Sequence, residues 1–147
     1  MDATQYHCSR IVNFPRSKVF AAHRDPSQLA IWWGPAGFTN TFHEFDFREG
    51  GRWHFTMHGP DGANYDNLWI FQHIIADELI DMRHDCAPFF NMRITLTDVP
   101  EGTCVDWLAT FDEANVLAAI LPIIKRCNEE NFDRLEAALS KIESCGN

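Results

Sequence analysis

The 147-residue sequence predicts an α+β protein in which a curved antiparallel β-sheet of six to seven strands wraps around one long C-terminal helix. Three observations lead to this expectation. Residues 39–111 alternate apolar and polar side chains between turn signals, which is typical of strands. Residues after Pro122 place apolar side chains three or four positions apart, which is typical of a helix. One apolar sheet face and one apolar helix stripe can bury each other, so we expect one domain spanning residues 1–147.

The N-terminal segment predicts a strand followed by two short helices. Residues 6–14 are rich in β-forming side chains, and residues 16–25 carry apolar side chains at helical spacing. A second helical turn covers residues 26–33. It must stop at Gly34-Pro35, because proline cannot continue the hydrogen-bond ladder and disfavours helical geometry in the residue before it.

The central segment predicts six strands joined by tight turns. Gly50-Gly51, Gly59-Pro60-Asp61-Gly62 and residues 98–102 have the composition of reverse turns. Asp46 and Arg48, beside the first turn, are interpreted as an ion pair that fixes it. The expected strands are residues 39–47, 53–58, 65–75, 79–84, 92–97 and 103–111.

The C-terminal third predicts helix. Asp112 is expected to cap a helix that runs to Leu121, and a long amphipathic helix follows Pro122. The apolar stripe of this long helix consists of Phe132, Leu135, Leu139 and Ile142.

The composition excludes several classes of function. The 12 basic and 21 acidic residues give a formal net charge of −9, which opposes binding to nucleic acid. The longest apolar run, Val116–Ile124, is about half the length of a membrane span, and the first residues lack a signal-peptide pattern, so we expect a cytoplasmic protein. Five scattered cysteines without a C-x-x-C pair indicate reduced thiols.

The seven histidines do not predict a metal site. His54 and His58 share a strand face, but four residues of strand separate them by roughly 13 Å. His84, Asp85 and Cys86 offer suitable ligand atoms without a second cluster. No nucleotide or nucleophile motif is present, so we expect neither a metal nor another cofactor.

Four motifs occur in a fixed order over the first 62 residues: Asp25-Pro26, Trp32-Trp33-Gly34-Pro35, Asp46-x-Arg48-x-Gly50-Gly51-x-Trp53 and Gly59-Pro60-Asp61-Gly62. With them the sequence resembles the single-domain bacterial homologues of the activator of the 90-kDa heat-shock protein ATPase. That family belongs to the START-like (SRPBCC) superfamily, whose helix-grip fold is Bet v 1-like. The resemblance implies a sheet around the C-terminal helix, with a cavity between them that relatives use for apolar molecules.

The resemblance and the strand pattern together suggest which residues line such a cavity. The large side chains could equally be plain core, because aromatic residues alone do not distinguish a pocket from packing. Leu68 and Trp69 depart from the family pattern and could fill part of the space. The candidates are Trp33, Trp53, Phe55, Met57, Trp69, Phe71, His84, Met92, Trp107, Leu117, Ile120, Phe132 and Leu135.

Three functions remain open at this point. The first is binding of a small lipid-like or polyketide-like molecule. The second is a role beside a 90-kDa heat-shock protein, although the sequence matches only the C-terminal domain of the activator. The third is a cyclase or dehydratase, for which His84 is the first candidate acid or base, with Tyr65 and Asp106 behind it.

Two apolar features also have more than one interpretation. Neighbouring side chains on a helix diverge by about 100°, so one indole of Trp32 and Trp33 should anchor the short helices while the other faces the cavity mouth or solvent. Val116–Ile124 is interpreted mainly as the buried entrance to the long helix. The alternatives are a gate hinged at Pro122 or an association surface, for example in a homodimer.

Overall fold

The protein is described by a computed structural model that covers the backbone of residues 2–145 and the side chains of residues 2–141. The fold is α+β, as the sequence predicts, with two short helices after the first strand and a long helix at the end. Its elements in chain order are β1 (Gln5–Val12), α1 (Arg16–Arg24), α2 (Pro26–Trp32), β2 (Thr39–Phe45), β3 (Arg52–His58), β4 (Asn64–Ile75), β5 (Leu79–His84), β6 (Phe90–Val99), β7 (Gly102–Phe111) and α3 (Ala114–Cys145).

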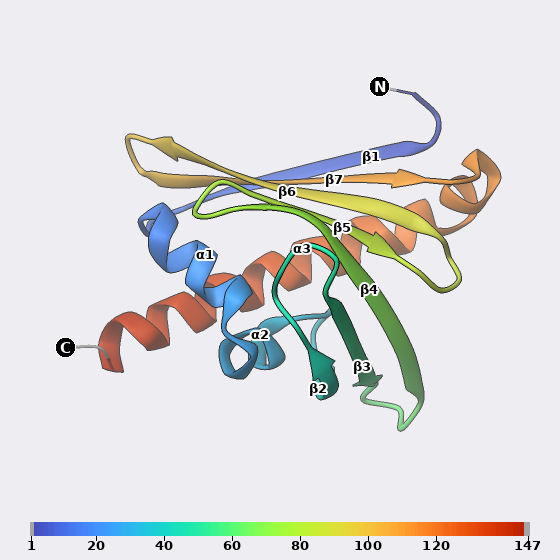
Figure 1. The fold of residues 1–147 in the computed structure, drawn as a ribbon, viewed down its shortest axis with the longest axis horizontal. Helices are drawn as coiled ribbons and strands as arrows, with labels where there is room; N and C mark the ends of the chain where they lie inside the picture. Colours follow the sequence, from blue (N-terminus) through green and yellow to red (C-terminus); the bar gives the residue numbers. More distant parts are fainter. Residues whose placement is uncertain (1, 146–147) are drawn as a thin grey trace.

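The seven strands form one antiparallel sheet in the order β1-β7-β6-β5-β4-β3-β2 (Figure 1). Each strand from β2 to β7 pairs with its neighbour in sequence, and β1 pairs with β7 at the far edge. Register shifts interrupt the pairing at His43 in β2 and at Gln72 in β4. Such bulges increase the local bend of a strand. The sheet is accordingly curved rather than flat.

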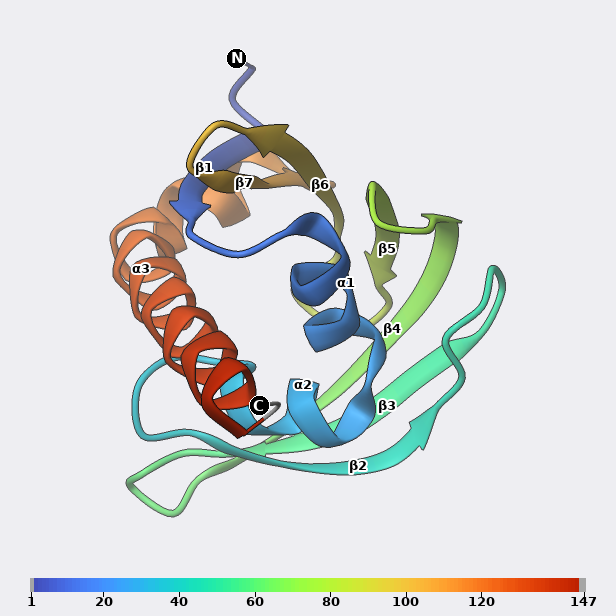
Figure 2. The same cartoon turned by 90° about the vertical axis from the view of Figure 1, so that its left-hand side faces the viewer.

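All three helices lie on the concave side of the sheet. Figure 2 shows α3 running along the opening of the curve, while α1 and α2 lie inside it. The apolar residues of β3 point toward these helices: Trp53 and Phe55 are almost completely buried. The helix stripe is buried as well, because Phe132, Leu135 and Leu139 are at most 1% exposed. The side chain of Ile142, the fourth residue of the predicted stripe, lies outside the described residues.

The predicted turns are confirmed. Arg48 donates from Nε to Oδ2 of Asp46 at 2.7 Å, which is the ion pair expected beside Gly50-Gly51. A Cβ atom at Gly51 would lie 2.0 Å from the carbonyl oxygen of Asp46, so only glycine fits there. Asp25 caps α2 by accepting a hydrogen bond from the backbone N–H of Ser27 at 3.0 Å.

The C-terminal helix differs from the prediction in two ways. Asp112 does not cap it, because its carboxylate accepts two hydrogen bonds from the Arg83 guanidinium, both at 2.7 Å. The helix also continues through Pro122 without a break. Pro122 lies on the exposed side of α3, where the carbonyl that loses its helical partner can meet water. The prediction of two successive helices was therefore wrong, and α3 is one long element.

Three smaller predictions can be compared with the described residues. Cys8, Cys86, Cys104 and Cys127 are free thiols, while the side chain of Cys145 lies outside the described part of the chain. No helix within the described residues has both the length and the apolar character that crossing a membrane requires. β1 ends at Val12, two residues before the predicted end.

Candidate ligand cavity

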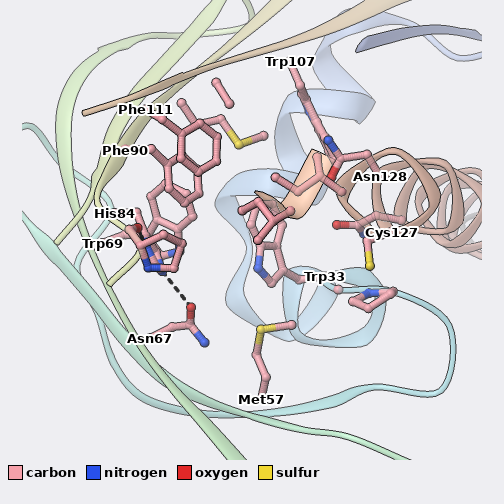
Figure 3. Close-up of a pocket in the computed structure, with 18 residues that line it drawn as sticks. Trp33, Met57, Asn67, Trp69, His84, Phe90, Trp107, Phe111, Cys127 and Asn128 are labelled. Atoms are coloured by element: carbon pink, nitrogen blue, oxygen red, sulfur yellow. Dashed lines mark hydrogen bonds between the residues drawn. The ribbon is translucent and has the colours of Figure 1, made fainter. Parts of the chain in front are cut away.

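A cavity of about 270 Å³ lies between α3 and the concave face of the sheet. Figure 3 shows sheet residues such as Trp69 and Phe90 on one side of it and α3 residues such as Cys127 and Asn128 on the other. Its walls are mainly aromatic and aliphatic. The lining residues are Trp33, Gly34 and Pro35 near α2; Met57, Asn67, Trp69, His84, Phe90, Met92, Trp107, Ala109 and Phe111 from the strands; Pro88 from a loop; and Ile120, Ile124, Cys127, Asn128 and Asn131 from α3.

The cavity exists because a small residue stands between large ones on β7. Strand alternation directs Trp107, Ala109 and Phe111 to the concave face, and the methyl group of Ala109 leaves space between the two rings. Across the cavity, Ile120, Ile124 and the polar residues after them recur at helical spacing along one face of α3. The space therefore results from the short side chain of Ala109 on the sheet beneath α3.

The corner after α2 supplies one end wall. Trp32 is fully buried, and its indole N–H donates to the carbonyl of Ala22 in α1 at 3.0 Å. Trp33 leaves the helix with extended backbone angles, and its ring borders the cavity. One indole thus anchors the short helices and the other faces the cavity. Because Trp33 is only 7% exposed, neither ring faces solvent. Of the two positions expected for the second ring, the cavity mouth or solvent, the structure therefore shows the cavity.

Arg134 of α3 fixes this corner in place. Its guanidinium donates hydrogen bonds of 2.6 to 3.2 Å to backbone carbonyls from both sides of the Gly34-Pro35 break. The acceptors are the carbonyls of Ile31, Trp33, Gly34, Pro35 and Phe38. Burial lowers the pKa of Arg134, with no carboxylate among these acceptors to compensate. No local sequence pattern indicates this contact, because its two ends lie about 100 residues apart.

His84 is the titratable group at the sheet side of the cavity. It is 5% exposed, and burial lowers the pKa of its imidazole below the ordinary value of 6.5. Its Nδ1 lies 2.7 Å from the carbonyl oxygen of Pro88, and its Nε2 lies 2.9 Å from Oδ1 of Asn67. The rings of Trp69 and Phe90 pack on it, each with its centroid 4.8 Å away. This histidine is held in one orientation by its two hydrogen-bond partners and these two rings.

The polar groups on the α3 side are two amides. Asn131 donates from Nδ2 to the carbonyl of Trp32 at 2.7 Å, and Asn128 donates from Nδ2 to Sγ of Cys8 at 3.4 Å. Both amide nitrogens are thus engaged with the protein. Neither Asn was expected from the sequence, although both continue the helical spacing that begins at Ile120.

The predicted lining residues fall into two groups. The structure brings Trp33, Met57, Trp69, His84, Met92, Trp107 and Ile120 together around the cavity. It places Trp53, Phe55, Phe71, Phe132 and Leu135 in the packed core, and Leu117 beneath a shallow surface groove beside Tyr6. Lining residues that were absent from the prediction are Gly34, Pro35, Asn67, Pro88, Phe90, Ala109, Phe111, Ile124, Cys127, Asn128 and Asn131. Strand alternation on β6 and β7 is the signal that could have found Phe90 and Phe111.

The other two acid–base candidates lie away from His84. Tyr65 is 47% exposed at the beginning of β4, where its ring packs against Phe38. Asp106 alternates with the inward-facing Trp107 and accepts a hydrogen bond from His7 at 2.9 Å on the convex face. Leu68 likewise alternates with Trp69, so only Trp69 occupies space at the cavity. The expectation that Leu68 fills part of the cavity was wrong.

Val116–Ile124 is not the buried entrance that the sequence suggests. Of its side chains only Leu117 is buried, and Ile123 is 55% exposed. Ile120 and Ile124 border the cavity from the inner side of the helix. The remaining apolar surface of this segment faces outward. Within the described residues, no group of three His, Cys, Asp or Glu side chains is placed to hold a metal ion.

Fold and cavity together define the class: an α+β helix-grip protein in which a curved sheet and a long C-terminal helix enclose an apolar space. The sequence model described as "Activator of Hsp90 ATPase homolog 1-like protein" matches residues 13–140. The chain therefore belongs to this family. A comparison with curated protein sequences gives no significant match.

Solved structures with the same fold come from several bacteria. A crystal structure from Nitrosomonas europaea is 17% identical and superposes with a TM-score of 0.90, covering 98% of this chain and 99% of the other. A solution structure from Arthrobacter aurescens is 22% identical with a TM-score of 0.88, covering 96% and 90%. An AHSA1-like protein from Aeromonas hydrophila is 21% identical with a TM-score of 0.75, covering 91% and 93%. At these identities the likeness establishes the fold.

Proposed function

We propose that the protein binds a small, mainly apolar molecule in the cavity beneath α3. The observation that carries this proposal is an apolar space of about 270 Å³ inside an otherwise densely packed protein. Ligand pockets typically have volumes of about 300–1,000 Å³, with apolar walls and a few fixed polar groups. The cavity lies just below this range, and His84, Asn67, Asn128 and Asn131 supply the polar groups.

The size of the cavity limits the ligand. A cavity of roughly 150 Å³ accommodates a benzene molecule. About twice that volume suits a two-ring aromatic compound or a short alkyl chain. The proposed ligand is therefore smaller than a sterol or a membrane phospholipid.

The N-terminal half of α3 is the proposed entrance. Ile120 and Ile124 line the cavity on this side, and Pro122 lies between them in the sequence. Because Pro122 leaves one helical carbonyl without its partner, local opening of α3 costs less here than in an uninterrupted helix. Movement of this turn would expose the cavity without disturbing the sheet.

A cavity-filling pair of variants tests the proposal. We expect the wild-type protein to bind the neutral two-ring fluorescent probe 1-naphthylamine saturably, with displacement by other apolar compounds. Ala109→Phe should reduce binding at least tenfold because the new ring occupies the cavity. Leu108→Phe, on the opposite face of the same strand, should bind like the wild type. Equal binding by all three proteins would place the probe elsewhere and contradict the proposal.

The chaperone-associated alternative rests on the family's name and has its own measurement. The ATPase rate of a purified 90-kDa heat-shock protein is measured with and without the protein. A stimulated rate, together with no saturable binding of the probe, would replace the ligand-binding proposal with this alternative. An unchanged rate with saturable probe binding supports the proposal.

A further inference from the structure

The hydrogen bonds of His84 do not match a neutral imidazole. The carbonyl oxygen of Pro88, 2.7 Å from Nδ1, can only accept a hydrogen bond. Oδ1 of Asn67, 2.9 Å from Nε2, is also an acceptor. A neutral histidine carries one N–H and one lone pair, so it can satisfy only one of these two partners.

Reversing the Asn67 amide does not resolve the mismatch. In its present orientation, Nδ2 of Asn67 donates to the carbonyl of Tyr65 at 3.2 Å. The reversed amide would donate to Nε2 of His84, but its oxygen would then face the Tyr65 carbonyl. The doubly protonated ring donates to Pro88 and to Asn67 at once, and only with it are all three contacts satisfied.

Nothing on the cavity wall balances the charge of such an imidazolium. Among the described residues that line the cavity, none has an aspartate, glutamate, lysine or arginine side chain. The titratable or charged groups that flank or face the ring are Arg83 on β5, Asp85 and Cys86 in the following loop, and Cys127 across the cavity on α3. The Arg83 guanidinium is paired with Asp112, and Sγ of Cys86 lies 3.4 Å from Nε2. Trp69 of β4 and Phe90 of β6, which pack on the ring, are uncharged.

Two residues of the wall also carry unpartnered donors. The indole nitrogens of Trp69 and Trp107 are buried without a hydrogen-bond partner. Neither nitrogen is accessible from the space of the cavity, so an acceptor oxygen of a ligand reaches them only if the rings shift. His84 is therefore the polar group on which the proposal rests.

Resting on the ligand-binding function proposed above, we propose that the ligand is an apolar acid whose carboxylate takes the place of Oδ1 of Asn67 as the acceptor for Nε2–H of the doubly protonated His84. Binding then takes up one proton on the histidine ring: neutral His84, a proton from solvent and the carboxylate combine into a buried ion pair. No covalent bond forms or breaks. The charge of each partner compensates the desolvation of the other.

Two probes of equal size separate this proposal from apolar binding in general. 2-Naphthoic acid carries the carboxylate, and 2-naphthalenemethanol carries a neutral hydroxyl on the same ring system. Their affinities are measured by calorimetry between pH 8 and pH 6, in buffers with different ionisation enthalpies. We expect the affinity for the acid to rise up to tenfold for each unit of pH lowered, with uptake of up to one proton. The affinity for the alcohol should stay constant.

His84→Gln removes the titrating group but keeps a polar side chain of similar reach. At pH 6 it should lose at least tenfold more affinity for the acid than for the alcohol, together with the proton uptake. His54→Gln, on the convex face, is the matched control and should change neither probe. Should His84→Gln fail to fold, NMR titration of the His84 ring in the wild type replaces it, and the acid but not the alcohol should raise its pKa.

The outcomes separate the two proposals. Equal, pH-independent binding of both probes by the wild type would overturn the acid proposal and leave apolar binding intact. Absence of binding by either probe would overturn both. Loss of alcohol binding in His84→Gln would show that the residue shapes the cavity rather than pairing with a carboxylate.

Discussion

The concave face of the sheet has a filled half and a hollow half. The filled half lies under α1 and α2, where packing leaves a void of only about 10 Å³ among residues that include His23, Leu29 and Trp53. The hollow half lies under α3 and encloses about 270 Å³. Trp33 borders both spaces and separates them. The same sheet is thus closed by two short helices on one side and spanned by a single helix on the other.

The two halves differ in the size of the side chains that point into them. In the filled half, Phe20 of α1 meets Phe47 with ring centroids 5.8 Å apart, and Trp53 stacks on Phe55 at 4.3 Å. In the hollow half, Ala109 presents only a methyl group. Protein interiors normally leave few voids larger than a water molecule. A space of this size in one half, beside dense packing in the other, is the contrast on which the proposed ligand site rests.

The largest expected effect distinguishes the two adjacent tryptophans. Trp32→Ala removes a fully buried ring and leaves the Ala22 carbonyl without its donor, so it should lower the free energy of unfolding by about 3–5 kcal/mol. Trp33→Ala should cost about half as much, because part of the Trp33 ring already faces empty space. Urea unfolding followed by circular dichroism measures both. Equal losses would mean that Trp33 is as tightly packed as Trp32. Trp33 would then not separate a filled half from a hollow half.

His23 makes the filled half sensitive to acid. It is 3% exposed and its Nε2 has no hydrogen-bond partner; burial lowers its pKa from 6.5 to about 4. The unfolded chain therefore takes up a proton before the folded protein does. Stability present above pH 6.5 is lost as the pH falls toward 4, by about 3 kcal/mol in total. His84 contributes in the same direction, because its pKa is lowered too.

Denaturant unfolding at several pH values between 7 and 4 measures this loss. His23→Gln should flatten the profile, whereas His54→Gln on the convex face should keep the wild-type slope. An unchanged slope in His23→Gln would show that another group controls acid unfolding.

Much of the architecture could be predicted because short-range patterns in the sequence determine it. Alternation located the strands, glycine and proline located the turns, and the spacing of Phe132, Leu135 and Leu139 identified the buried stripe of α3. The outcome for Asp112 shows the limit of such reasoning. It has the composition of a cap, but Arg83 from another strand binds it instead.

The cavity was harder to predict, because its existence depends on the spacing between separate elements and not on any single residue. It depends on Ala109 standing opposite Ile120 and Ile124, and the distance between their elements is set by the whole fold. Large aromatic residues such as Trp53 and Trp69 look alike in sequence, but one is core and the other borders the cavity. The amides of Asn67, Asn128 and Asn131 became visible as cavity groups only once the strands and α3 were placed together.

The border between the halves should depend on Arg134. Arg134→Lys keeps the charge but cannot reach five carbonyls with one planar group, so it should lower the free energy of unfolding by about 2 kcal/mol. Arg10→Lys is the contrasting change, because the acidic partners of Arg10 on α3 are 42–69% exposed. Its cost should stay below about 1 kcal/mol. Urea unfolding measures the free energy of unfolding of both variants. Equal losses would mean that the hydrogen bonds of Arg134 stabilise the protein no more than the exposed ion pairs of Arg10 do.

The smallest effect gives the sharpest comparison, because the same substitution can be made in both halves. Ala22→Leu in α1 adds three carbon atoms at a position with no exposure, and overpacking of this kind costs about 1–3 kcal/mol. Ala109→Leu adds the same atoms beside the cavity, so its stability should stay within about 0.5 kcal/mol of the wild type while probe affinity falls. Thermal unfolding with and without 1-naphthylamine measures both quantities. If Ala109→Leu were as destabilising as Ala22→Leu, the hollow half would have no room for a side chain, and therefore none for a ligand.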